Sequence, residues 1–517
     1  MNDNPRAKER YMQWRNVSSS TSTLTNGLSL LATALLTALP APAFAERGNI
    51  PVIEQVTRNT VGTVTDAELR SELGTWITFA STGDVMGPGT QTAGSEVYLY
   101  NVITGTTTRV TNSGPGRESY EPSRVSDSTF SAGRPDSFFF TSTGNFTGQN
   151  ADGNPEIFVY EIVAAQFHQL TNTTAPVVNK TPFTSDSAKC IVFASTGNID
   201  NNDGSDDANV GPGYSNADGS QEVFLYTVSD NANFPSGYFT QISSGPAGTS
   251  SWAPTIGGYW FPRQCQTSAY LSNHAQLGDG ALGTHIYEYD RPAGEVKRMF
   301  NEDVFVHGEV PPDGFYGEPH ISSASNFARG PYIVFSTSAD IWNNGSTSTG
   351  YQMFRYRVFH PLMTQYSGVT LGDVFKPQIS DGGGYIAFHS NSEILNDRGA
   401  KHIGPGPFNP DNNSEIFETK GRRKIWQITE SAGCDNYDVS IQDHGGGIAF
   451  LSTCDLVPGS NPAGIPQVFL FRRVRSDDPV LQPGTCSILE GCCNEANGCY
   501  RQVFGKMDRP PKRNELE

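Results

Sequence analysis

The stretch CIVFASTGN (190–198) contains a short apolar run followed by Ser, Thr and Gly. Near copies lie at 76–84 (WITFASTGD) and 137–145 (SFFFTSTGN). Looser copies, each with an apolar pair, a spacer and a serine, lie at 269–275, 333–340, 386–393 and 448–455. The seven serines are Ser81, Ser142, Ser195, Ser272, Ser336, Ser390 and Ser452, with 53 to 77 residues between successive members. One unit written seven times is typical of a repeat architecture.

Each unit is predicted to contain four strands. In the second unit these are EPSRVSD (121–127), SFFFTST (137–143), PEIFVYEI (155–162) and FHQLTN (167–172). Aromatic and β-branched runs separated by Gly, Asp and Asn predict strands joined by turns. The fourth strand carries a recurring pair, at Arg109/Thr111, Gln169/Thr171, Gln241/Ser243, Gln365/Ser367 and Gln427/Thr429. The first strand often begins with proline, at Pro122, Pro182, Pro254, Pro319 and Pro377.

The seventh unit lacks its own fourth strand. After QVFLFRR (467–473) no Gln-x-Thr pair follows, whereas VIEQVTRN (52–59), ahead of the first unit, has Gln55 and Thr57 in the paired places. A ring of sheets leaves only short, protected edges, and neighbouring sheets bury each other's faces. We therefore predict an all-β fold: a seven-bladed β-propeller of four-stranded antiparallel blades, closed by the N-terminal strand.

The repeat resembles that of a known family. The pattern P-x-x-S-D-G-x-x-I-A-F-x-S, followed by D-G-x-x-E-I-[FY]-x-Y and Q-x-T, resembles the TolB-like propeller repeat, a relative of the WD repeat. The best match is KPQISDGGGYIAFHSNSEI (376–394) with NNSEIFE (412–418) and WQIT (426–429). The resemblance covers roughly residues 50–475 and implies the fold. TolB has an α/β domain ahead of its propeller that is not expected here, so a TolB-like propeller is implied rather than TolB.

The N-terminus predicts export. Basic residues precede the apolar run 28–39, and Ala43-Phe44-Ala45 follows it, as in a secretory signal peptide. The alternative, a membrane anchor, needs a longer apolar run. We therefore divide the chain into a signal peptide (1–45), the propeller (46–475) and a Cys-rich tail (476–517), and expect a periplasmic or secreted protein without a membrane span.

Charge and composition limit the classes of partner that the protein is expected to bind. Among 517 residues there are 54 Gly and 33 Pro, only 17% are charged, and the formal net charge is −18. Such a composition favours many short strands and turns. The acidic balance argues against nucleic acid and anionic membranes. A protein or glycan partner is expected, with the chain a monomer.

The eight cysteines predict disulfides, because an even number in an exported chain is typical of disulfide pairing. Four are scattered, at Cys190, Cys265, Cys434 and Cys454, and four cluster in the tail, at Cys486, Cys492, Cys493 and Cys499. The cluster is expected to pair within itself. A zinc site is its alternative, although no His lies within the cluster.

The predicted binding site lies on the propeller axis. The first strand of each blade lines the channel and brings Glu121, Arg124, Glu318, His320, Lys376 and Asp438 toward it. Because both charges occur, we expect mutual neutralisation and a structural His320. The loops from second to third and from fourth to first strand are long and emerge on one face, here called the long-loop face. Recognition is expected there, since loops on a rigid scaffold commonly bind ligands.

One loop is a candidate calcium site. Within NIDNNDGSDDANVGPGYSNADGSQE (198–222), the acidic side chains are Asp200, Asp203, Asp206 and Asp207. Calcium prefers several oxygen ligands on a turning loop. Since the spacing does not match an EF-hand, a solvated loop rich in turn residues is the simpler interpretation, and calcium is kept as the alternative.

The sequence favours a non-catalytic binding or scaffold module over an enzyme. No G-x-S-x-G or H-E-x-x-H motif occurs, and the repeated serines are one per blade, unlike a nucleophile. The alternative is a metal-assisted polysaccharide lyase or hydrolase at the channel mouth. The propeller lyase that cleaves oligogalacturonate, which the repeat also resembles, depends on several His ligands, and only His320 falls on a channel strand here. Trp252, Trp260 and Trp342, in or beside loops, are candidates for stacking on a glycan.

Overall fold

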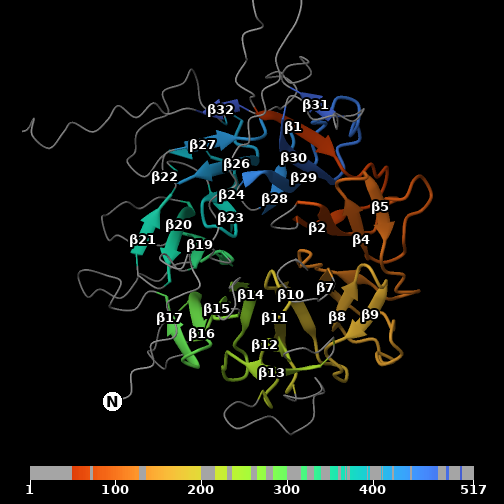
Figure 1. Cartoon of the computed structure of the whole chain (residues 1–517), viewed down its shortest axis with the longest axis vertical. Coiled ribbons are helices and arrows are strands. Elements are labelled where there is room, and N and C mark those ends of the chain that lie inside the picture. The colour runs from red at the N-terminus through yellow and green to blue at the C-terminus, as the bar shows by residue number, and fades with distance from the viewer. Residues whose placement is uncertain are drawn as a thin grey trace, which may run out of the picture. The chain divides into compact units, whose positions relative to one another are not determined.

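The chain forms a ring of antiparallel blades around a central axis (Figure 1). The computed structural model describes residues 49–503, apart from 70–73, 127–135, 200–215, 230–233, 235, 258–264, 275–282, 300–315, 323–330, 339–349, 359–361, 367, 370–372, 393, 396–408, 410, 422–423, 443–444, 476–484 and 488–500. This part contains seven blades and no α-helix. The predicted seven-bladed β-propeller is confirmed; the predicted signal peptide lies outside the described residues.

The first four blades each contain four strands that are consecutive in the sequence. Blade 1 has β2 (Val64–Leu69), β3 (Trp76–Ser81), β4 (Glu96–Asn101) and β5 (Thr106–Arg109). Blade 2 has β6 (Ser119–Tyr120), β7 (Ser137–Ser142), β8 (Glu156–Glu161) and β9 (Gln166–Gln169). Blade 3 has β10 (Asn179–Thr184), β11 (Cys190–Ser195), β12 (Glu222–Val228) and β13 (Gly237–Gln241). Blade 4 has β14 (Ser251–Gly257), β15 (Thr267–Ser272), β16 (His285–Asp290) and β17 (Glu295–Arg298).

The remaining blades include the two ends of the described chain. Blade 5 has β18 (His320–Ile321), β19 (Tyr332–Thr337), β20 (Gln352–Arg357) and β21 (Leu362–Gln365). Blade 6 has β23 (Val374–Ile379), β24 (Tyr385–Ser390), β26 (Glu415–Lys420), β27 (Lys424–Gln427) and β32 (Arg501–Val503). Blade 7 has β28 (Asn436–Ile441), β29 (Gly447–Ser452), β30 (Gln467–Arg475), β1 (Asn49–Gln55) and β31 (Thr485–Ser487). β22 (Gly368–Val369) and β25 (Ile394–Leu395) form a separate two-stranded sheet.

The N-terminal strand closes the ring, as predicted. β1 pairs antiparallel with β30 along its whole length, with Ile53 opposite Phe471. Just beyond β1, the hydroxyl of Thr57 accepts a hydrogen bond from the backbone N–H of Val468 at 2.9 Å. The first described strand of the chain therefore completes the last blade.

The segment after the last repeat extends two blades. β31 pairs with the outer side of β1, and β32 pairs with the outer side of β27. Two sheets thereby gain a fifth strand, which the sequence analysis did not anticipate. The cysteines at 492, 493 and 499 lie outside the described residues, so the predicted pairing of the tail cluster stays a prediction.

A buried hydrogen-bond network explains the repeated Glu of the third strand and the Thr or Ser of the fourth. In blade 1, the Glu96 carboxylate accepts bonds from the Thr111 hydroxyl at 2.6 Å and the Ser113 N–H at 2.9 Å. The backbone N–H of Val97 in turn donates to Thr111. Equivalent pairs are Glu156/Thr171, Glu222/Ser243 and Glu415/Thr429. The motif therefore fixes the outer strand of a blade to its neighbour, since buried polar groups require partners.

The repeated serine has an equally structural role. The Ser81 hydroxyl donates to the carbonyl of Thr63, which precedes β2, and accepts from the Gly83 N–H at 2.9 Å. Ser142 and Ser390 make the same pair of bonds. The glycine is required sterically, because a Cβ at Gly83 would lie 2.7 Å from the carbonyl oxygen of Val61. The serine therefore ties the end of the second strand to the start of the first.

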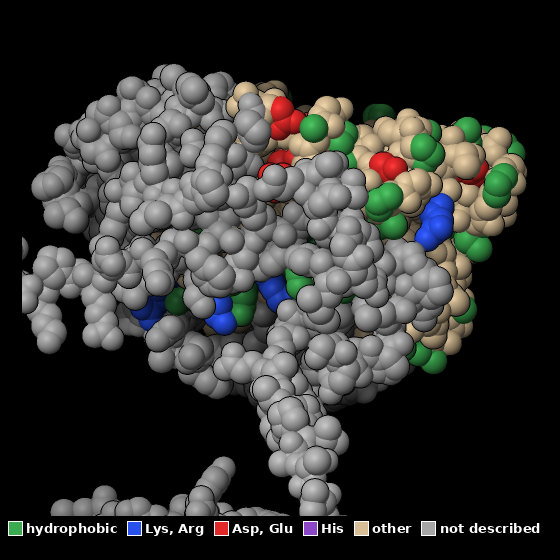
Figure 2. All heavy atoms as spheres, turned by 90° about the horizontal axis from the view of Figure 1, so that it is seen from above, with side chains coloured by type: hydrophobic (Ala, Val, Ile, Leu, Met, Phe, Trp, Pro, Cys, Tyr) green, Lys and Arg blue, Asp and Glu red, His purple; other side chains and the backbone are tan. Residues whose placement is uncertain are grey.

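Apolar side chains and disulfides hold neighbouring blades together. Phe139 of β7 packs in one buried cluster with Phe193 of β11 and Phe224 of β12. One disulfide, Cys190–Cys265, joins blade 3 to the residue just before β15 of blade 4, and another, Cys434–Cys454, lies in blade 7. The predicted disulfide bonding of the four scattered cysteines is confirmed. On the described atoms visible in Figure 2, hydrophobic side chains are scattered singly, as are the exposed Ile103 and Val163 of two separate turns.

Candidate functional site

In five blades, a β-bulge in the innermost strand aims one side chain at the axis. The pairing of β2, β10, β14, β23 and β28 with the next strand shifts by one residue at the same place in each of these blades. The residues at the shift have positive φ: Asp66 54°, Thr181 52°, Ala253 49°, Lys376 39° and Asp438 54°. Glu121, just after β6 of blade 2, also has a positive φ, of 51°. A bulge bends the strand and redirects a side chain. A bulge also accommodates the proline that often follows this residue, because proline has no backbone N–H to donate to the neighbouring strand.

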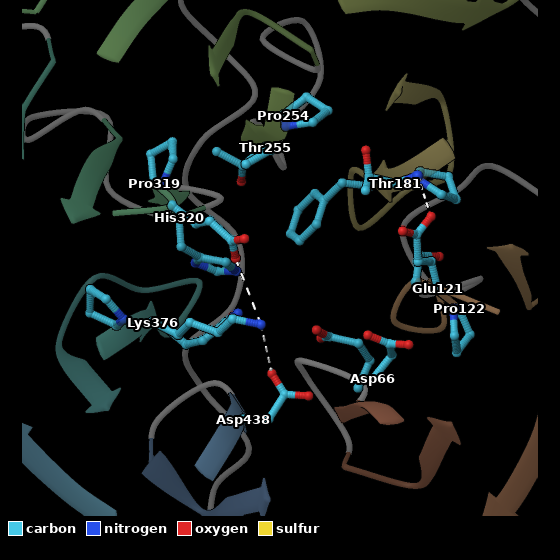
Figure 3. A pocket seen from close by; sticks show the side chains of 18 residues that line it. Asp66, Glu121, Pro122, Thr181, Pro254, Thr255, Pro319, His320, Lys376 and Asp438 are labelled. Atoms are coloured by element: carbon cyan, nitrogen blue, oxygen red, sulfur yellow. Dashed lines mark hydrogen bonds and ion pairs between the residues drawn. The ribbon is translucent and has the colours of Figure 1, made fainter. Parts of the chain in front are cut away.

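These residues enclose a cavity on the propeller axis (Figure 3). Its volume is about 310 Å³, and every blade contributes to its wall. The bulge residues and their equivalents in blades 2 and 5 are Asp66, Glu121, Thr181, Ala253, Glu318, Lys376 and Asp438. The prolines that follow five of them, Pro122, Pro182, Pro254, Pro319 and Pro377, supply apolar surface. The cavity therefore combines a charged ring with apolar walls, as small-ligand sites commonly do.

Arg124 spans the axis on the side away from the long-loop face. Its guanidinium lies 3.0 Å from Asp186 of blade 3 and 3.2 Å from Asp381 of blade 6. Both aspartates lie in the turn that leaves the innermost strand, and all three side chains are buried. Because blades 2 and 6 face each other across the ring, this ion-pair network lies across the channel.

One side of the cavity carries its own cation. Lys376 Nζ lies 3.3 Å from Asp438 Oδ1 and 3.9 Å from Glu318 Oε2 (Figure 3). The charge of Asp438, together with that of Glu318, raises the pKa of Lys376 although partial burial opposes the shift. Lys376 is therefore a stable cation that neutralises its two neighbours. The predicted mutual neutralisation holds for this part of the ring.

The adjoining side is acidic. Asp66, Glu68 and Glu121 line the cavity and make no ion pair with the described residues. Burial raises the pKa of Glu68 to about 7, and burial followed by the charge of Asp438 raises that of Asp66. Glu121 accepts hydrogen bonds from the Thr181 N–H at 2.7 Å and the Thr141 hydroxyl at 3.0 Å. Burial nevertheless raises the Glu121 pKa. The carboxyl groups on this side of the cavity are therefore not neutralised by ion pairs with described residues.

His320 is held as a neutral ring. Its Nδ1 accepts a hydrogen bond from the Ile379 N–H at 3.2 Å, so the proton of the neutral imidazole is on Nε2. Burial, aided by the charge of Arg124, lowers the His320 pKa well below its usual range. Its ring meets Phe183 edge-on, with 5.4 Å between ring centroids. The ring is therefore held between Ile379 of blade 6 and Phe183 of blade 3, and its predicted structural role stays a prediction.

Most of the predicted axial residues meet in this cavity. Glu121, Glu318, His320, Lys376 and Asp438 line it. Arg124 instead lies buried beyond the cavity, in the network with Asp186 and Asp381. The candidate calcium ligands Asp200, Asp203, Asp206 and Asp207 lie outside the described residues.

Sequence reasoning missed Asp66 and Glu68. The innermost strand of blade 1 reads VTDAEL and lacks the proline that marks this strand in other blades. Spacing was the available signal: Asp66 lies 15 residues before Ser81, much as Asp438 lies 14 before Ser452. Counting back from the repeated serine therefore locates the acidic residue of blade 1, which the proline of the first strand does not mark.

The structure also bears on a metal site, the tryptophans near loops and a membrane span. Within the described residues, no three His, Cys, Asp or Glu side chains are grouped so that they could hold a metal ion. Trp252 packs, partly buried, against the core between blades 4 and 5, whereas Trp260 and Trp342 lie outside the described part. In the same part of the chain, no helix is long and apolar enough to cross a membrane.

Comparisons with known proteins agree on the propeller architecture alone. No protein-family model matches the sequence, and no curated protein matches it. Oligogalacturonate lyase from Vibrio parahaemolyticus is 12% identical, with 81% of this chain and 93% of that chain covered and a TM-score of 0.46. The β-propeller domain of the Trilobed protease from Pyrococcus furiosus is 10% identical, with coverages of 82% and 99% and a TM-score of 0.44. TolB from Acinetobacter baumannii is 11% identical, with coverages of 85% and 81% and a TM-score of 0.32.

Proposed function

We propose that this protein is an exported, non-catalytic binding module that holds a protein or glycan partner at the long-loop face of its propeller. The axial cavity is the part of that face where the partner is anchored. The observation that carries the proposal is that residues from all seven blades converge on one axial cavity, while the buried ion pairs of Arg124 lie beyond it on the side away from the long-loop face.

The rigidity of the cavity supports a binding role. Its wall is built from bulges in paired strands rather than from loop tips, and Thr181 and Thr141 hold the Glu121 carboxylate in place. A preorganised site of this kind loses less conformational entropy on binding. Export is supported by the two disulfides, because such bonds persist in oxidising compartments. No observation on the described residues favours the alternative, a metal-assisted lyase or hydrolase.

Photo-crosslinking in the producing cell tests which face is used. A photoreactive amino acid replaces Met86, in the exposed loop between β3 and β4 on the long-loop face. The matched position is Val163, in the turn between β8 and β9 on the opposite face, which is more exposed still. We expect a discrete adduct from position 86 and none from position 163. Equal adducts from both positions, or an adduct from 163 alone, would contradict the proposal.

A further inference from the structure

The charges around the cavity are unevenly balanced. Five carboxylates and one lysine lie in its wall, and the lysine is engaged by Asp438 and Glu318. Asp66, Glu68 and Glu121, from the adjacent blades 1 and 2, are left without an ion-pair partner among the described residues. Arg124, the nearest buried cation, is already paired with Asp186 and Asp381. Burial raises the pKa of all three carboxyl groups, and a cation bound beside them would offset the cost of ionising them.

A second, independent feature is a free donor in the same wall. His320 is only 5% exposed, and its Nδ1 is occupied by the Ile379 N–H. The protonated Nε2 makes no hydrogen bond to a described residue, although the ring lines the cavity (Figure 3). This N–H can therefore donate to an oxygen atom of a ligand that enters the cavity. The cavity thus offers a cation site and, in the same small volume, one donor for a ligand oxygen.

We propose that the cavity binds a primary ammonium group on an aliphatic stem, with the ammonium on the acidic side of the wall beside Asp66 and Glu68 and with His320 Nε2 donating to an oxygen near the other end of the stem. The inference rests on the proposed binding function and adds the chemistry of the bound group. Pro122, Pro182 and Phe183 line the cavity close to the acidic side chains and supply the apolar contact that methylene groups require. A lysine side chain with its own backbone carbonyl has this chemistry, as does a free amine.

The probe is N-acetyl-lysine-N-methylamide, titrated calorimetrically into the full chain at low salt. Its matched control is the norleucine compound, which has the same aliphatic stem without the ammonium. We expect the lysine compound to bind and the norleucine compound to bind at least about tenfold more weakly, because ammonium–carboxylate hydrogen bonds are the strong ones. Pentylamine distinguishes a free amine from a lysine side chain as the natural ligand. If pentylamine binds as tightly as the lysine compound, the ligand is a free amine; if it binds more weakly, the ligand is the lysine of a larger partner.

Variants locate the ammonium group. Asp66→Asn removes one charge and keeps a residue that tolerates positive φ, so it should weaken binding about tenfold. Glu68→Gln is a second variant with the same expectation. Lys376→Gln should strengthen binding, because it removes the cation that competes for the ring. Asp152→Asn, in the exposed loop between β7 and β8, should leave the affinity unchanged.

The inference is overturned if neither amine binds, if norleucine binds as well as lysine, or if both Asp66→Asn and Glu68→Gln bind like the unaltered chain while melting at its temperature. Failure of this inference can be told from failure of the proposed function. If the chain binds no amine but the adduct at position 86 persists, the proposed binding function stands and the ammonium site is wrong.

Discussion

Thr57 donates its hydroxyl proton to the side-chain oxygen of Gln467 across 2.7 Å, although the two residues are 410 positions apart. Gln467 stands in blade 7 where Glu96 and Glu415 stand in blades 1 and 6, and Thr57 stands where Thr111 and Thr429 do. The bond therefore joins the two ends of the propeller by the same network that each blade uses internally. Closure of the ring depends on side-chain chemistry as well as on the pairing of β1 with β30.

Replacing Thr57 by Val should open this junction. The substitution keeps the shape but leaves the Val468 N–H without the Thr57 hydroxyl as its acceptor and removes one of the buried hydrogen bonds to the Gln467 side chain. We expect a loss of about 2 kcal/mol in the free energy of unfolding, measured with urea. Thr429→Val in blade 6 should cost a similar amount, and Thr106→Val, on the exposed strand β5, almost nothing. A Thr57 variant as stable as the Thr106 variant would contradict closure by this network.

Deletion of residues 46–60 should have a larger effect. It removes β1, so β30 would present an unpaired edge and blade 7 would lose the Ile53 contact with the core of blades 6 and 7. We expect unfolding to lose its cooperativity, because a ring that cannot close no longer unfolds as one unit. Calorimetry reports the change, and a single sharp transition like that of the intact chain would refute it.

Loss of Arg124 should destabilise the whole ring. Arg124→Met leaves Asp186 and Asp381 buried without the cation that pairs with both. Removing one partner of a buried ion pair typically costs about 3 kcal/mol or more. Urea unfolding should show this loss, while Arg291→Met, whose partner Tyr238 is exposed, should stay within about 0.5 kcal/mol of the unaltered protein.

Stability should fall as pH rises from about 6.5 to 8; at lower pH the depressed pKa of His320 makes stability rise with pH and opposes the fall. Burial raises the folded-state pKa of Glu68 and Glu288 to about 7, above the usual value in an unfolded chain. The folded protein therefore binds these protons more tightly, and their stabilising contribution is complete below about pH 4 and lost as pH rises through 7. The upper limit is about 3 kcal/mol for each group. Hydrogen bonds lower the pKa of Asp84 and Asp455, which opposes the trend only in more acidic solution.

Glu288→Gln isolates one of these contributions. The variant cannot ionise, so it should be more stable than the unaltered chain at pH 8 and its stability should depend less on pH. Urea unfolding at pH 5.5 and pH 8 measures both quantities. The control is Glu295→Gln, at an exposed position of the neighbouring strand β17. An unchanged pH dependence in the Glu288 variant would show that this group is ionised normally in the folded protein.

Much of the fold could be predicted because short sequence motifs that recur in each blade determine it. The pair of Gln or Arg with Thr or Ser on the fourth strand and the apolar run ending in Ser each appear several times, and Gln55 and Thr57 repeat that pair ahead of the first unit, so blade number and closure follow from counting. In blade 2 the predicted innermost strand at 121–127 is wrong in position: the strand is Ser119–Tyr120, and it ends where Glu121 adopts a positive φ of 51°. Strands β31 and β32 were not anticipated, since a single occurrence without a repeat carries no such signal.

The site was harder to predict than the fold. Pro122 and Pro377 marked the neighbouring Glu121 and Lys376, which the structure places in the cavity wall. Asp66 had no such marker, and the position of Arg124 beyond the cavity depends on Asp186 and Asp381 from two other blades. Which charges are paired and which are not is a property of the assembled ring, because it depends on distances between residues far apart in sequence.

The most direct test of the central claim, that the partner is anchored in the axial cavity, is to fill that cavity and repeat the crosslinking. Gln378→Trp places a large side chain in the wall without removing a charged group. With the photoreactive residue at position 86, we expect this variant to lose the adduct while it retains its melting temperature. An adduct of undiminished yield from a folded Gln378→Trp protein would contradict the claim.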